Sequence, residues 1–142
     1  MTLFNVLIVD DEEEFREMTI KRLKKRNLQC EGAENGEQAL ECITKGDFDV
    51  VLLDVKMPGM GGVETLREIK RIKPLIEVVM LTGHASVESG IDGMKLGAFD
   101  YLMKPMELEP LLEKLKDAYE KKRIQQNKIE KAQFKKHMSI PS

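Results

Sequence analysis

Residues 50–54 read VVLLD, and residues 6–10 read VLIVD. Each stretch is a run of four apolar residues that ends in an aspartate, without the alternation of apolar and polar residues that marks a strand exposed on one face. Such continuous runs are typical of strands that helices cover on both faces of a parallel sheet. Residues 76–81 and 99–103 are similar runs, each interrupted by one acidic residue, and residues 28–33 are a weaker candidate for a fifth strand.

Helical patterns lie between these runs. Apolar residues recur at spacings of three and four in the stretches 15–23, 39–43, 63–72, 86–96 and 108–115. Asn35, followed by Gln38 three residues later, is a typical N-cap for the second of these helices. Strand and helix thus alternate five times, which predicts an α/β fold: a doubly wound, five-stranded parallel sheet with five helices.

Composition bounds the function classes. The chain has 142 residues, of which 42% are hydrophobic and 34% charged, which suits one globular domain with one core. A formal net charge of −2 argues against nucleic acid or an anionic membrane as the main partner. The two cysteines, Cys30 and Cys42, form no CxxC pair, and the first residues show no signal-peptide pattern. We therefore expect reduced thiols in a cytoplasmic protein.

The charge is distributed unevenly along the chain. Residues 113–136 carry nine Lys or Arg against four Asp or Glu, whereas the rest of the chain is acidic. Apolar residues become sparse after about residue 119, so we predict a domain over residues 1–120 and a basic, helical extension or linker over residues 121–142. Good helix formers follow Pro110, which suits a first helical turn, so the last helix should run into this extension. The extension either packs against a second copy or an output segment, or is a solvated helix that frays near Asn127.

Residues suited to chemistry follow four of the predicted strands: Asp10 with Asp11, Asp54, Thr82, and Lys104. The carboxyl ends of parallel strands meet at one edge of the sheet, where ligands bind in open α/β folds. If the first and third strands are neighbours, three carboxylates face one another and favour a hard divalent cation such as Mg²⁺. Each residue alone has an ordinary explanation, as a helix N-cap, a turn residue, a β-branched strand residue or a solvated lysine. Their common position at strand ends favours a functional site.

Four motifs extend this pattern. They are VLIVDDE at 6–12, VLLDVKMPG at 51–59, LTGH at 81–84 and GAFDYLMKP at 97–105. Together they resemble the receiver domains of bacterial two-component response regulators, over about residues 4–119. The resemblance implies a flavodoxin-like fold of the chemotaxis-regulator type, with strand order 2-1-3-4-5.

The resemblance also implies a role for each acidic residue. Asp54 corresponds to the phosphoacceptor, which attacks the phosphohistidine of a sensor histidine kinase or a phosphotransfer protein and becomes an aspartyl phosphate. The implied cofactor is Mg²⁺, held directly by Asp11, Asp54 and the backbone carbonyl of Lys56. Asp10 corresponds to the residue that holds a metal-bound water.

Further positions match the family's switch. Lys104 would pair with one phosphoryl oxygen and the Thr82 hydroxyl with another, and the Lys104–Pro105 peptide bond corresponds to a cis peptide. Tyr101 matches the aromatic residue that moves inward when the threonine moves; the alternative is a half-exposed tyrosine at a strand edge. Two positions that vary within the family, Lys56 and His84, either tune the lifetime of the phosphoryl group or lie in solvent.

The implied function is a phosphorylation-dependent signalling switch that catalyses only its own phosphorylation and dephosphorylation and is not otherwise an enzyme. Phosphorylation would change a surface made by the fourth helix, fifth strand and fifth helix, which would bind a downstream effector or output domain. This surface or the C-terminal helix would also serve a possible homodimer. Neither nucleic acid nor a membrane is expected to bind directly.

Two alternatives remain open at this point. One is that the chain is the N-terminal receiver of a larger response regulator whose output domain is absent from it. A Mg²⁺-dependent phosphatase with an aspartate nucleophile fits less well, because it needs an Asp-x-Asp pair after the first strand, where this chain has adjacent Asp10 and Asp11. A flavin or nucleotide site is disfavoured by five consecutive acids in the first loop and by the lack of a glycine-rich phosphate loop.

Overall fold

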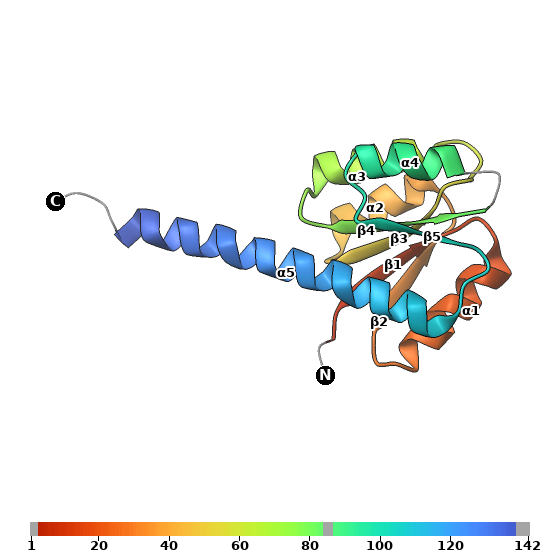
Figure 1. The fold of residues 1–142 in the computed structure, drawn as a ribbon, viewed down its shortest axis with the longest axis horizontal. Coiled ribbons are helices and arrows are strands. Elements are labelled where there is room, and N and C mark those ends of the chain that lie inside the picture. Colours follow the sequence, from red (N-terminus) through yellow and green to blue (C-terminus); the bar gives the residue numbers. More distant parts are fainter. Residues whose placement is uncertain (1–2, 84–86, 139–142) are drawn as a thin grey trace.

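Five parallel strands form one sheet in the computed structural model, which describes residues 3–83 and 87–138 (Figure 1). The strands are β1 (Asn5–Val9), β2 (Gln29–Ala33), β3 (Val50–Asp54), β4 (Glu77–Thr82) and β5 (Asp100–Met103). Their order is β2-β1-β3-β4-β5, and every neighbouring pair is parallel. The predicted flavodoxin-like topology is confirmed.

Helices cover both faces of the sheet. They are α1 (Glu13–Lys24), α2 (Gly36–Lys45), α3 (Gly62–Ile72), α4 (Val87–Lys95) and α5 (Leu108–Met138). Helices α1 and α5 lie on one face, and α2, α3 and α4 lie on the other (Figure 1). Each connection from one strand to the next therefore crosses over through a helix, as the alternating pattern predicts.

The continuous apolar runs are explained by burial on both sides of the sheet. Successive side chains of a strand point to opposite faces. In β1, Val6 and Ile8 join the core beneath α1 and α5, whereas Leu7 and Val9 join the core beneath α2 and α3. None of these four side chains is exposed to solvent.

Local signals set where the helices begin. The Asn35 side chain accepts a hydrogen bond from the Gln38 N–H at 2.8 Å, so the predicted N-cap of α2 is confirmed.

The buried face of α1 is slightly rotated relative to the face that the apolar pattern predicts. Met18 is 45% exposed, and Ile20 is buried in its stead beside Leu23.

Helix α5 has 31 residues and projects well beyond the rest of the molecule (Figure 1). Its buried residues all lie in the first third of the helix: Leu111, Leu112, Leu115 and Ala118. Every residue from 123 to 138 is exposed, yet the helix continues past Asn127 without a break. The expected long C-terminal helix is thus confirmed, and the predicted fraying near Asn127 is not observed.

Within the described ranges, no helix combines the length and apolar content needed to cross a bilayer.

Two contacts fix the direction in which α5 leaves the sheet. The ring of Tyr119 stacks on that of Phe4, with centroids 4.6 Å apart. The Lys122 ammonium lies 2.6 Å from the Asp49 carboxylate, just before β3. The side chains of residues 123–138 are all exposed and do not pack on the sheet.

A glycine is required where α3 starts, because the helix packs directly on the end of β3. A Cβ atom on Gly62 would lie 2.5 Å from the Asp54 carbonyl oxygen and 2.6 Å from the Val55 Cα. These atoms belong to the backbone and cannot turn aside. Gly62→Ala is therefore expected to lower the free energy of unfolding by about 1–3 kcal/mol, as overpacking does.

Urea unfolding measures this effect, and the neighbouring glycine supplies the matched control. A Cβ on Gly61 would meet no atom within 4 Å, so Gly61→Ala should change stability by less than about 1 kcal/mol. Equal stability of the two variants would contradict the packing argument.

Candidate functional site

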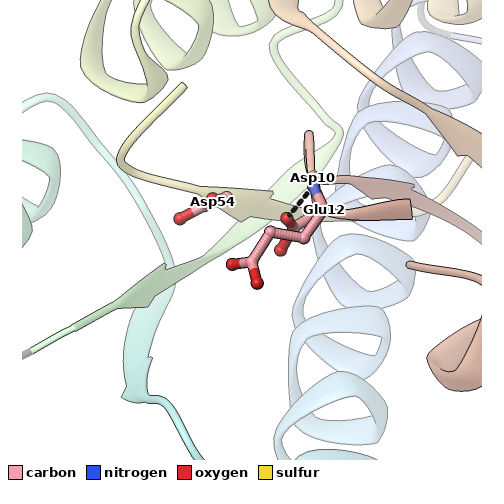
Figure 2. Close-up of side chains that lie close together, drawn as sticks. All are labelled: Asp10, Glu12 and Asp54. Carbon is pink, nitrogen blue, oxygen red and sulfur yellow. Dashed lines mark hydrogen bonds between the residues drawn. The ribbon is translucent and has the colours of Figure 1, made fainter. Parts of the chain in front are cut away.

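Asp10 and Asp54 lie side by side at the carboxyl edge of the sheet, because β1 and β3 are hydrogen-bonded neighbours (Figure 2). Asp10 directly follows β1, and Asp54 is the last residue of β3; both are buried. Glu12 comes from the loop after β1, and one carboxylate oxygen from each of the three residues lies within 4.8 Å of the others. Three acids therefore converge on one small volume.

Asp10 is held in place by its own loop. Its Oδ1 accepts a hydrogen bond from the Glu12 N–H at 2.9 Å, which closes a tight turn. Its backbone carbonyl accepts a hydrogen bond from the Arg16 guanidinium at 2.8 Å, and its N–H donates to the Ala33 carbonyl on β2. The second carboxylate oxygen is thereby directed into the acidic cluster.

Lys104 supplies the positive charge of the cluster. Its Nζ lies 2.7 Å from Asp10 Oδ2, 3.2 Å from Glu12 Oε1 and 3.7 Å from Asp54 Oδ2. The same ammonium lies 4.3 Å above the ring centre of Phe15. Burial alone would lower the pKa of Lys104, but the hydrogen bond to Asp10 and the charge of Asp54 raise it above the ordinary value. The Lys104–Pro105 peptide bond is cis.

Asp54 is the acid with the most strongly perturbed environment. Burial raises the pKa of its carboxyl group from 3.8 to about 6, and the nearby charge of Asp10 contributes in the same direction. Lys104 and the Lys56 N–H, which donates to Asp54 Oδ1 at 3.2 Å, oppose this shift. Asp54 is thus an ionised carboxylate at neutral pH that is only weakly solvated, which makes it an available nucleophile.

Thr82 ends β4 beside these residues and is fully buried. Among the described residues its hydroxyl has no hydrogen-bond partner, which is uncommon for a buried polar group. Tyr101 lies on the edge strand β5 and is 37% exposed. The structure therefore records the half-exposed position for this ring. His84 lies outside the described residues.

A comparison with protein families identifies the arrangement. The family model described as "Response regulator receiver domain" matches residues 6–116. The chain belongs to this family. Its receiver domain is a signalling module, and the receiver domains of response regulators are phosphorylated on an aspartate.

Known proteins resemble the whole receiver domain. The transcriptional regulatory protein ZraR of Escherichia coli is 38% identical over 114 residues, which are 80% of this chain and 26% of ZraR. The DNA-binding transcriptional regulator NtrC of the same organism is 36% identical over 104 residues, 73% of this chain and 22% of NtrC. The chain thus spans about a quarter of the length of these relatives.

Solved structures agree in fold. A response regulator receiver domain protein from Clostridium thermocellum superposes with a TM-score of 0.82 at 33% identity, over 85% of this chain and 98% of that one. NtrX from Brucella abortus in complex with ADP gives 0.84 at 27% identity, over 89% of this chain and 29% of that one.

The acidic cluster does not have the same members as the ligand set that the family resemblance implies. The resemblance implies Asp11 as a direct ligand and Asp10 as an indirect one, whereas the acidic cluster contains Asp10 and Glu12. The Asp11 side chain is exposed, and its charge influences the pKa of Asp54 less than that of Asp10 does. The physical reason is the turn after β1, which Asp10 closes, so that the Glu12 side chain extends back over the cluster (Figure 2). A direct role for Asp11 stays a prediction.

Two residues of this site are not predicted from the sequence. Glu12 stands out there only as part of an acidic run, although its spacing of two from Asp10 is a usable signal. Arg16 lies one helical turn after Glu12, and its side chain crosses Gly32 of β2, where an added Cβ would come within 3.0 Å of the Arg16 Cδ. Neither contact follows from motif spacing alone, because both depend on the path of the loop.

The donor set suits a hard divalent cation. Carboxylate oxygens are the ligands that Mg²⁺ prefers. Two of the three acids are buried, so a cation would relieve their mutual repulsion more effectively than at an exposed cluster. The Lys104 ammonium lies among the same oxygens, so a bound cation and this ammonium compete for Asp10.

Proposed function

We propose that this receiver domain accepts a phosphoryl group on Asp54 and thereby acts as a signalling switch. The donor is the phosphohistidine of a sensor histidine kinase or of a phosphotransfer protein. A carboxylate oxygen of Asp54 attacks phosphorus, the P–N bond to the imidazole breaks, and the imidazole takes up a proton as it leaves. The observation that carries the proposal is the buried Asp54 carboxylate, 3.7 Å from the Lys104 ammonium at the carboxyl edge of the sheet.

The neighbouring residues supply charge and hydrogen-bond donors. Lys104 donates to one phosphoryl oxygen once its bond to Asp10 is given up. The Thr82 hydroxyl, which has no partner among the described residues, donates to a second oxygen. Phosphoryl transfer depends mainly on such positioning and charge neutralisation.

The proposed cofactor is Mg²⁺. Asp10, Glu12 and Asp54 would hold it, with the backbone carbonyl of Lys56 and the Asp11 carboxylate as further ligands implied by the family pattern. When bound, Mg²⁺ supplies positive charge to the transferred phosphoryl group. The chain promotes only its own phosphorylation and dephosphorylation in this proposal. Lys56 and His84 tune the lifetime of the aspartyl phosphate in this proposal.

The output is a change of surface. Movement of Thr82 toward the phosphoryl group frees space beside β4, and Tyr101 turns from its half-exposed position into that space. The surface of α4, β5 and α5 then binds a downstream effector or output domain in a different state. We assign this reaction to the cytoplasm.

One experiment tests the acceptor directly. The chain is incubated with Mg²⁺ and a small phosphodonor such as acetyl phosphate, and the acyl phosphate is trapped by borohydride reduction before peptide mapping. The expected result is one modified residue per chain, at Asp54, and no modification when Mg²⁺ is removed by a chelator. A label on Asp10 or Asp11, or on no residue, would refute the assignment.

A second candidate function has the same phosphorylation chemistry, but places this receiver domain within a longer protein. The relatives ZraR and NtrC are about four times as long as the matched region, which supports the alternative that this receiver domain controls an output domain within a larger response regulator. Translation of the reading frame around these 142 residues decides between the two contexts.

A further inference from the structure

A charged stripe runs along the outward face of α5 and changes sign at Ile124. Glu113, Asp117 and Glu120 lie 11, 7 and 4 residues before Ile124. Lysines lie 4, 7 and 11 residues after it, at Lys128, Lys131 and Lys135. Residues at these spacings share one face of an α-helix. The stripe is therefore symmetric about Ile124 in position and opposite in charge.

No described segment of the chain covers this stripe. All six charged residues are exposed. In the part of the chain that the structure describes, only Glu120 has an ion-pair partner, its own neighbour Arg123. The face of α5 that contacts the sheet is a different one and carries Leu111, Leu115 and Ala118.

Apart from the Glu120–Arg123 ion pair, the described part of the helix pairs none of the charges of this stripe. Glu113 and Asp117 are like charges four residues apart, as are Lys131 and Lys135. Such pairs destabilise a helix by the same few tenths of a kcal/mol by which opposite pairs stabilise it. A solvated rod would be better served by acids and lysines alternating along the stripe, so the segregation calls for a partner.

We propose that the partner is a second copy of this chain, bound through α5 in an antiparallel, two-fold symmetric pair. A two-fold axis at Ile124 brings Glu113, Asp117 and Glu120 of each copy opposite Lys135, Lys131 and Lys128 of the other. An isologous interface of this kind needs a self-complementary surface. In a parallel pair, each charged residue would instead face the same residue of the other chain. Like charges would then meet, so the parallel orientation is disfavoured.

The rest of the helix is compatible with this pairing. From Pro110 to Met138, no two positions equidistant from Ile124 carry like charges. The large apolar residues near the stripe would also be covered, since Ile124 is 44%, Phe134 65% and Met138 71% exposed. Ile124 of one chain contacts Ile124 of the other at the two-fold axis. The burial of this apolar surface stabilises the dimer in addition to the charge pairs.

Sedimentation velocity over a range of protein concentrations tests the proposal on the full 142-residue chain. The wild type is expected to shift from a mass of 16.2 kDa to twice that value as concentration rises, and added salt should weaken the dimer. Two charge-reversed variants are compared with it. One carries Glu113→Lys, Asp117→Lys and Glu120→Lys, and the other carries Lys128→Glu, Lys131→Glu and Lys135→Glu.

Each variant alone should dimerise at least ~10-fold more weakly than the wild type. An equimolar mixture of the two should recover the dimer, because every reversed charge then meets its opposite. This recovery also shows that the variants fold, and circular dichroism checks their helix content. A monomeric wild type, or variants that self-associate as strongly as the wild type, overturns the proposal.

Cross-linking tests the orientation. Glu113→Cys and Lys135→Cys chains are mixed and oxidised, with the wild type as the control for Cys30 and Cys42. The antiparallel pair predicts a disulfide between the two different variants. Disulfides that join only identical variants would show a parallel pair and overturn the proposal.

Discussion

The Asp54→Asn variant is expected to accept no phosphoryl group and yet to unfold at a higher urea concentration than the wild type at neutral pH. Asparagine lacks the nucleophilic carboxylate, so the adduct should be lost completely. The substitution also removes a buried negative charge from beside Asp10. Because burial and Asp10 raise the pKa of Asp54 to about 6, the charge costs stability, and its removal should gain about 1–3 kcal/mol.

The pH dependence separates this effect from a general improvement in packing. Below about pH 4, Asp54 is protonated in both the folded and the unfolded chain. Between pH 4 and 6 the folded chain keeps the proton that the unfolded chain has lost, so the stability contributed by the neutral form is lost as pH rises toward 6. The advantage of the Asp54→Asn variant should therefore be small at pH 4, grow up to about pH 6 and then level off.

Urea unfolding in the presence of a chelator measures this difference. The matched control is Asp92→Asn, which neutralises an exposed aspartate of α4 and should leave the stability difference near zero at every pH. If the Asp54→Asn variant is more stable than the wild type by the same amount at pH 4 and pH 7, the carboxylate charge is not the cause of the effect.

The fold was largely predictable because its signals are local. The runs ending at Asp10 and Asp54 are apolar at every position, and only strands buried on both faces need that pattern. The N-cap at Asn35 and the long helix after Pro110 likewise depend on a few neighbouring residues. The strand order, by contrast, came from the resemblance, since the apolar runs alone do not say which strands are neighbours.

The site was predictable in outline and not in detail. Residues at strand ends are brought together by the topology, which explains Asp54 and Lys104. The contacts of Glu12 and Arg16 depend on the conformation of the loop after β1, where a shift of one residue exchanges an inward for an outward side chain. The exposed Met18 shows the same limit for a helix, because a small error in the phase of the periodicity moves a residue from the buried face to the surface.

The Lys104→Met variant should affect metal binding and phosphorylation in opposite directions. The Lys104 ammonium lies 2.7 Å from Asp10 and competes with Mg²⁺ for the same oxygens, so calorimetry should show Mg²⁺ bound several-fold more tightly to the variant. Without this donor to the phosphoryl group, phosphorylation of Asp54 at saturating Mg²⁺ should slow by roughly 100-fold. The metal-free variant should also lose about 2–4 kcal/mol of stability, because Asp10 stays buried without its partner. Lys45→Met, at an exposed lysine of α2, serves as the control. A variant with weakened Mg²⁺ binding and unchanged phosphorylation would show that Lys104 organises the metal ligands and makes no contribution to phosphoryl transfer.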